Sequence, residues 1–201
     1  MGSACTGNGA GRPCFFISQK EDGMKLRDRY GWEKPLYAGL RDKARAVVGA
    51  YQNAARHLDA LQEFVYIEIG LVHTAHKIHN LAHEMPKRFD AFGEMLHENH
   101  LMTEYPATPE FQNMYEDMDE VFDCIAGVLD EIQMALHAFR EEAEKDARLL
   151  PMALVAEDLM VENSQSRTLF NEMWAMYDDT TVSATSFDNW VKDLDDGEGD
   201  E

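Results

Sequence analysis

Apolar residues recur at steps of three and four along most of the chain after Leu36, and this spacing predicts helices. A first helical pattern runs from Leu36 toward Tyr51, with a break expected at Asn53. A second pattern starts at Ala54. Its apolar positions are Leu58, Leu61, Val65, Ile69 and Val72. The predicted fold class is all-α, because the apolar and polar alternation of β-strands is absent.

The second half of the chain carries the longest helical patterns. Between Pro106 and Pro109 the pattern is interrupted, and Thr108 is expected to cap the helix that follows. The apolar positions of that helix are Phe111, Met114, Met118, Val121, Ile125, Val128, Ile132, Leu136 and Phe139. A last helix is indicated by Met152, Val155, Leu159, Leu169, Met173 and Tyr177. These patterns predict an antiparallel bundle over residues 34–178. It follows a flexible leader, 1–33, and precedes a loose acidic tail, 179–201, with one short amphipathic piece at 187–191.

Pro86 leaves two arrangements of the middle of the chain open. It lies in the segment 83–88, which lacks the Gly, Asn or Asp of most turns. Either a tight turn separates two helices there, or one long helix is kinked at the proline. The choice decides which polar side chains can meet.

Charge is distributed unevenly over the 201 residues, whose net charge is −20. Residues 1–88 carry 13 basic and 9 acidic residues, whereas residues 89–201 carry 5 and 29. Such a surface repels nucleic acid and anionic membranes and attracts cations.

Three cysteines do not form a disulfide framework, so a cytoplasmic location is expected. No apolar run is long enough for a transmembrane segment. Residues 1–6 fit an N-myristoylation pattern, but an upstream extension before Met24 is the preferred interpretation.

Six of the eight histidines lie between residues 73 and 100. His76, His79 and His83 share one helix face and continue the apolar row that begins at Leu58. Imidazoles on a core-facing row need partners, which a metal ion or carboxylates would supply. A second candidate pair is Glu94-x-x-His97, the spacing by which one helix offers a carboxylate and an imidazole to one ion.

Further carboxylates stand where apolar residues are expected. Glu68 and Glu162 fall in apolar rows of their helices, and Glu131 flanks the longest row. If Pro86 only kinks a helix, one layer would hold His76, His79, His83, Glu131, His137 and Glu162. If Pro86 is a turn, the layer would hold His76, His79, Glu94, His97 and Glu120. Either set of nitrogen and oxygen ligands suits iron, manganese or zinc.

The helix number, the Glu94 and His97 pair, and the two core-row carboxylates resemble the ferritin-like proteins, with a fainter likeness to the Dps mini-ferritins. The resemblance covers residues 36–178. It implies a bundle that binds iron, or alternatively manganese or zinc, oxidises and stores it as a ferroxidase-type oxidoreductase, and forms a homo-oligomer. The candidate metal ligands are His76, His79, His83, Glu94, His97, Glu68, Glu131 and Glu162. A hemerythrin-like bundle ranks lower, because its histidine and glutamate motifs would stand in the reverse order.

Two other functions remain open. The chain could be a non-enzymatic helical interaction protein whose acidic surface and tail bind a partner. It could also be a bundle that responds to pH through histidine protonation.

Overall fold

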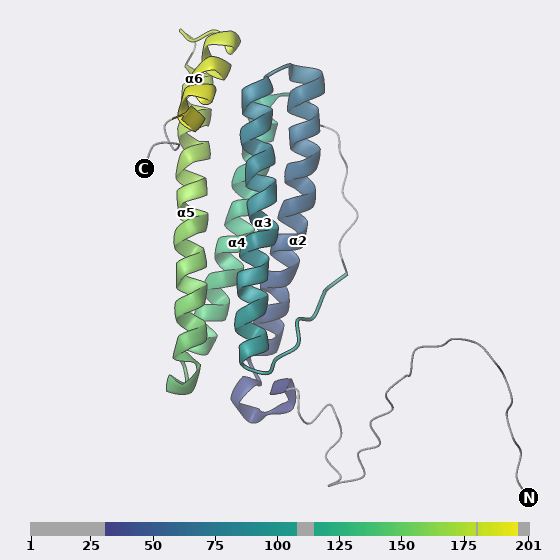
Figure 1. Ribbon diagram of the computed structural model, residues 1–201, viewed down its shortest axis with the longest axis vertical. Helices are drawn as coiled ribbons and strands as arrows, with labels where there is room; N and C mark the ends of the chain where they lie inside the picture. The colour runs from purple at the N-terminus through teal and green to yellow at the C-terminus, as the bar shows by residue number, and fades with distance from the viewer. Residues whose placement is uncertain (1–30, 108–114, 180, 197–201) are drawn as a thin grey trace, which may run out of the picture.

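The structure is a computed structural model, and it describes residues 31–107, 115–179 and 181–196. This part of the chain is helical and contains no β-strand, which confirms the predicted all-α class. Its long helices are α2 (Leu40–Phe64), α3 (Val72–Glu98), α4 (Met118–Ala143) and α5 (Leu150–Asp178) (Figure 1). The shorter elements are η1 (Gly31–Glu33), η2 (Pro35–Tyr37), the π-helical turn η3 (Val65–Ile69), η4 (Ala147–Leu149) and α6 (Ala184–Asp196). None of the described helices combines the length and apolar character needed to cross a bilayer.

Two predicted helix boundaries are corrected, and the choice left open at Pro86 is decided. The first long helix begins at Leu40, and it passes without a break through Asn53, whose side chain donates a hydrogen bond across to Glu131 of α4. The break lies instead at Gly70, whose φ of 80° is the left-handed conformation that glycine adopts most easily. Pro86 lies inside α3, so the one-helix alternative is confirmed and the turn is wrong. Thr108, Pro109, Phe111 and Met114 lie outside the described residues.

Side-chain contacts fix the directions of α2, α4 and α5. Asn53 of α2 bonds to Glu131 of α4, whereas His57, further along α2, contacts Cys124 near the start of α4. α2 and α4 are therefore antiparallel. α4 and α5 are antiparallel for the same reason. Arg140, near the end of α4, contacts Glu157, near the start of α5. Asp119, near the start of α4, contacts Trp174, near the end of α5.

The described parts of the connection between α3 and α4 lie against α2. Pro106 packs against Gly49, where a β-carbon would lie 2.9 Å from the proline ring, so the missing side chain makes the close approach possible. Tyr115 then lies beside Phe64 at the far end of α2, with ring centroids 5.5 Å apart. α4 consequently starts where α2 ends and runs parallel to α3. The four long helices thus run up, down, down and up, with one long connection in the middle (Figure 1).

The core forms from one apolar row of each long helix, as the spacing of three and four predicts. Fully buried members include Leu58, Leu61, Ile78, Met85, Phe92, Ile125, Leu129, Ile132, Phe139, Met152 and Met173. The rings of Phe92 and Phe139 meet edge to face with centroids 5.0 Å apart, which joins α3 to α4 across the bundle.

The segment expected to be a loose tail contains the helix α6, which packs against α3 and α5. Phe187 and Val191 are buried, and Phe187 contacts Tyr177 of α5. Asp188 accepts hydrogen bonds from the backbone N–H of His73 and of Thr74 and from the Thr74 hydroxyl. α3 has no cap from its own flanking residue, so Asp188 caps it from another helix and places a negative charge at its positive end.

The turn at Gly70 and the surface glycine Gly127 form a matched pair for a stability test. Gly70→Ala should lower the free energy of unfolding by about 1–2 kcal/mol, because alanine is strained in the left-handed conformation. Gly127→Ala, in open space on α4, should raise it by about 1 kcal/mol through helix propensity. Urea unfolding followed by circular dichroism measures both. Equal effects of the two substitutions would contradict the turn.

Candidate functional site

A layer of polar side chains crosses the middle of the bundle. Asn163 of α5 is buried, and its amide nitrogen donates to the Leu129 carbonyl at 2.8 Å and to Gln133 Oε1 at 2.9 Å, both on α4. On the side of α5 that faces α3, Arg88 of α3 contacts Glu162 and Ser166. Tyr51 of α2 completes the layer, since it is close enough to Arg88 for the guanidinium to lower its pKa. All four long helices therefore contribute to one level.

Arg88 is the charged centre of this layer. Its side chain is 11 % exposed, and its Nη2 donates to the hydroxyl of Ser166 at 2.9 Å. Its Nε lies 3.3 Å from Glu162 Oε2, an ion pair without hydrogen-bond geometry. Nε and Nη1 have no hydrogen-bond partner among the described residues. A buried guanidinium with two unpaired donors is a costly group, which marks this level of the bundle as unusual.

The same layer contains a tyrosine hydroxyl without a partner. Tyr51 is 1 % exposed, and its hydroxyl makes no hydrogen bond to the described residues. Burial raises the pKa of Tyr51 well above its ordinary value, against the smaller opposing effect of Arg88, and Glu162 adds to the rise. The hydroxyl is therefore held neutral at every physiological pH.

These residues do not fit the iron site that a ferritin-like bundle would hold. Such sites gather carboxylates and imidazoles from facing helices in the bundle core. Here the core level carries a permanent positive charge on Arg88, which repels a metal ion, and its one carboxylate, Glu162, is half exposed and paired with that arginine. In the described ranges no three His, Cys, Asp or Glu side chains are arranged to hold an ion.

The predicted histidine row does not face the core, and that expectation is wrong. His76 and His83 are exposed and His79 is half buried, while α3 buries Ile78 and Met85 instead. The physical reason is the turn at Gly70–Leu71. Gly70 and Leu71 are not helical, so α3 starts with its own axis and its own rotation. The apolar row of α2 therefore does not continue into α3.

The predicted carboxylates are also exposed, Glu68 in η3, Glu94 on α3, Glu131 on α4 and Glu162 on α5, so the expected core positions of Glu68 and Glu162 are wrong. His97, likewise exposed, has its Nε2 3.3 Å from the Thr103 hydroxyl. Neither predicted layer forms. Glu162 lies at the level of Arg88, and Asn163 beside it contacts Gln133, not His137. The alternative layer needs a turn at Pro86, but α3 continues through that residue.

The position of Arg88 in an apolar row of the sequence indicates that its side chain is buried. Leu81, Met85, Arg88 and Phe92 follow one another at steps of four, three and four, and the other three are buried. The rule that singled out carboxylates in apolar rows applies equally to this arginine. Arginine has no lone pair to offer a metal ion, so a prediction based on metal ligands does not include Arg88.

Cys124 of α4 and His57 of α2 form a second contact between titratable groups, with Sγ and Nδ1 3.7 Å apart. Burial raises the pKa of the Cys124 thiol, and Glu120 adds to the rise. Burial also lowers the pKa of His57, against the opposing effect of Glu131. Both pKa shifts favour the neutral thiol and the neutral imidazole.

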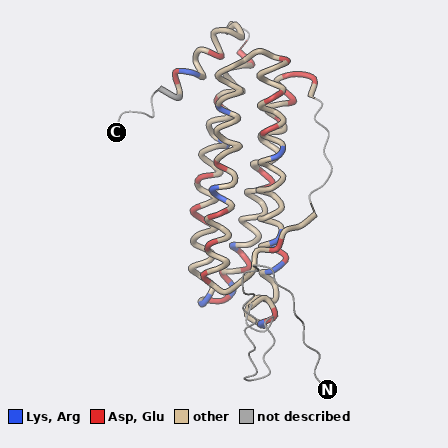
Figure 2. The backbone as a smooth tube through the Cα atoms, turned by 45° about the vertical axis from the view of Figure 1, so that its right-hand side comes forward, with Lys and Arg blue, Asp and Glu red and all other residues tan. Residues whose placement is uncertain are grey.

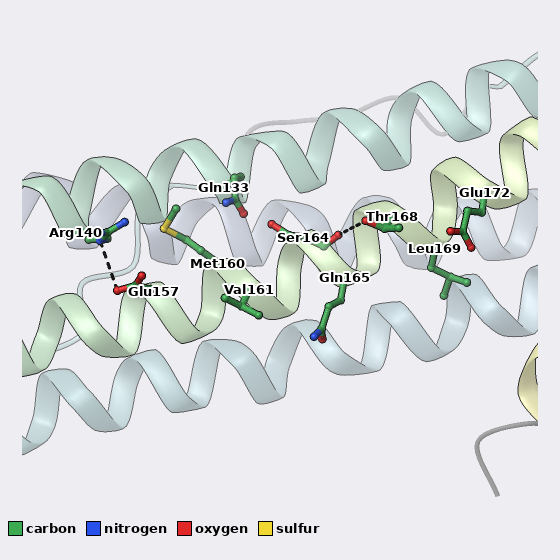
Figure 3. Close-up of a pocket in the computed structure, with 10 residues that line it drawn as sticks. All are labelled: Gln133, Arg140, Glu157, Met160, Val161, Ser164, Gln165, Thr168, Leu169 and Glu172. Carbon is green, nitrogen blue, oxygen red and sulfur yellow. Dashed lines mark hydrogen bonds and ion pairs between the residues drawn. The ribbon is translucent and has the colours of Figure 1, made fainter.

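A groove of about 610 Å³ runs along α5 beside α4 (Figure 3). Apolar Met160, Val161 and Leu169 line it, and the acidic Glu157 and Glu172 lie at its two ends. Its remaining lining is polar and consists of Gln133, Arg140, Ser164, Gln165 and Thr168. An apolar strip with Glu172 at one end and the Glu157–Arg140 pair at the other offers a surface to a partner that carries both apolar and basic groups.

Tyr51→Phe tests the unpaired hydroxyl in the polar layer. The substitution should leave the free energy of unfolding at pH 7 unchanged or raise it by up to about 1 kcal/mol, because no hydrogen bond is lost. Above pH 10.0 the unfolded chain releases the tyrosine proton that the folded protein retains, so unfolding of the wild type becomes easier as pH rises. Tyr51→Phe should therefore gain stability over the wild type in urea unfolding above that pH. Tyr66→Phe, on an exposed ring, is the control, and parallel pH profiles for wild type and Tyr51→Phe would contradict the burial.

Comparison with known proteins leaves the function to be argued from this geometry. No protein-family model matches the chain, and no curated protein sequence matches it. The two features that remain are a core level centred on a cation and an apolar groove on the acidic half of the bundle.

Proposed function

We propose that the protein is a non-enzymatic interaction protein that binds a basic, amphipathic segment of a partner on the face formed by α4 and α5. The carrying observation is the apolar groove on α5, with Glu172 at one end and the Glu157–Arg140 ion pair at the other (Figure 3). A cytoplasmic location, favoured by the sparse cysteines, is part of this proposal.

The exposed side of α5 continues the apolar surface beyond the groove. Leu150, Leu154 and Val161 are about half exposed, and they recur on one side of the helix at steps of four and seven. On α4 the side chain of Met134 is 67 % exposed. Large apolar side chains gathered on one face are typical of protein interaction surfaces, because their burial by a partner is favourable.

The charge of this face selects the kind of partner. α4 carries seven acidic residues and one basic residue, and α5 carries five and one. The two basic residues are already paired, Arg140 with Glu144 and Glu157, and Arg167 with Asp130. Acidic positions recur along the bundle and basic ones are few (Figure 2). The unpaired acids would attract a basic segment and repel the same face of a second copy, so the proposed homo-oligomer would need another face.

Substitution of Val161 tests the proposed docking face. A labelled helical peptide of Leu and Lys should bind the full chain in fluorescence anisotropy at about 0.15 M salt. Val161→Asn should weaken binding about tenfold, because burial of a valine side chain is worth about 1.5 kcal/mol. Asn and Val have similar helix propensity, so the helix itself is preserved. Ile67→Asn, which changes an exposed apolar side chain in η3, is the control, and equal losses in both variants would refute the docking face.

Ferritin-like iron chemistry is a second proposal, and one observation favours it. The four long helices have one long connection between the second and third, which is the connectivity of ferritin-like bundles. His76, His79 and His83 lie together on the outer side of α3, the other candidate ligands are exposed elsewhere, and the core level holds Arg88, so the connectivity is its only support.

Aerobic addition of ferrous iron separates the two proposals. An interaction protein should oxidise ferrous iron no faster than buffer does, because the described residues offer no cluster of three or more carboxylates and imidazoles. A ferritin-like protein should consume oxygen in proportion to protein concentration. Absorbance of the ferric product with elemental analysis of the purified chain measures both. Protein-dependent oxidation would overturn the interaction proposal in favour of iron chemistry.

A further inference from the structure

The outward side of α3 carries three histidines at successive turns. His76 and His83 are exposed and His79 is half buried. The rings of His79 and His83 meet edge to face with centroids 4.3 Å apart, and their Nε2 atoms are 3.0 Å apart. The ring of His76 is stacked 6.3 Å from that of His79, so it lies near the pair without sharing its close nitrogen contact.

The separation of the two Nε2 atoms matches two neighbouring positions around a metal ion. Imidazole nitrogens bind Zn²⁺ at about 2.0–2.1 Å, so two of them lie about 2.9 Å apart at a right angle and about 3.3 Å apart at a tetrahedral angle. The observed 3.0 Å falls between these values. An ion could therefore replace the shared proton of this histidine pair without a change of helix geometry. Each ring would then carry its proton at Nδ1.

From this the geometry points to a two-histidine site for a divalent transition-metal ion at His79 and His83, on the outer surface of α3. Imidazole ligands suit Zn²⁺, Ni²⁺ and Cu²⁺, whereas Mg²⁺ and Ca²⁺ require oxygen ligands. Water fills the remaining coordination positions, because no third His, Cys, Asp or Glu of the described residues is placed to bind the same ion. The site is independent of the peptide-binding face and of iron chemistry in the bundle core.

Two properties of the chain favour this site. The histidines are four residues apart on α3, which is continuous from Val72 to Glu98, so the helix holds both rings on one side before the ion arrives. A chelating pair that is held in place loses little conformational entropy on binding. The net charge of −20 raises the concentration of cations near the surface.

Nickel titration of the full chain by calorimetry tests the site. Wild-type protein should bind Ni²⁺ through the pair, and His83→Asn should weaken this binding about 100-fold, because the second imidazole binds in an intramolecular step. His137→Asn, which changes an exposed histidine on α4, should leave the affinity unchanged. His76→Asn should also leave it unchanged if two histidines form the site. Circular dichroism of each variant verifies that the bundle is intact.

A spectroscopic measurement counts the ligands directly. Cu²⁺ added below one equivalent should show hyperfine coupling to two nitrogens by electron paramagnetic resonance in wild type, and to fewer in His83→Asn. Equal Ni²⁺ affinities of His83→Asn and His137→Asn would overturn the site. An equal loss in His76→Asn and His83→Asn would overturn the two-histidine form of it.

Discussion

Burial of the Arg88 guanidinium in the middle of the bundle is the constraint on which the rest of the site depends. A guanidinium cannot lose its charge inside a protein, so it has to find acceptors where it lies. Ser166 accepts one hydrogen bond and Glu162 forms an ion pair with the guanidinium, and both residues come from α5. α3 and α5 are therefore tied together at this level by polar contacts, whereas the apolar rows that surround it hold the bundle above and below.

The same charge determines what the bundle core can do. A metal ion at the level of Arg88 would be repelled by its positive charge, and this repulsion is stronger where the surroundings are of low polarity. The tyrosine and asparagine beside Arg88 contribute neutral groups, and Tyr51 is held protonated by burial. Chemistry of a ferritin-like kind would need carboxylates at this level. The features with ligand-binding character lie on the outside instead, the histidine pair on α3 and the groove on α5.

The long connection between α3 and α4 decides how those outer features are distributed. Because it runs back along α2 past Gly49, it lets α4 lie antiparallel to α2 and parallel to α3. α4 and α5, on which acidic residues far outnumber basic ones, then form one side of the bundle as neighbours. The histidines belong to α3, on an element of nearly balanced charge. Separate surfaces thus present different chemistry, one acidic and apolar and the other imidazole.

The sequence by itself determined the helical class, the extent of α5 and most of the core, because steps of three and four place apolar side chains on one side of any helix. It also allowed one helix through Pro86, which the structure confirms. It did not determine the side of α3 that faces inward, since the left-handed turn at Gly70 restarts the rotation of the chain. For that reason the three histidines were expected in the core and lie outside it. Only the packing of α5 against α3 decided that the Arg88 side chain is largely buried and that Glu162 serves as its partner.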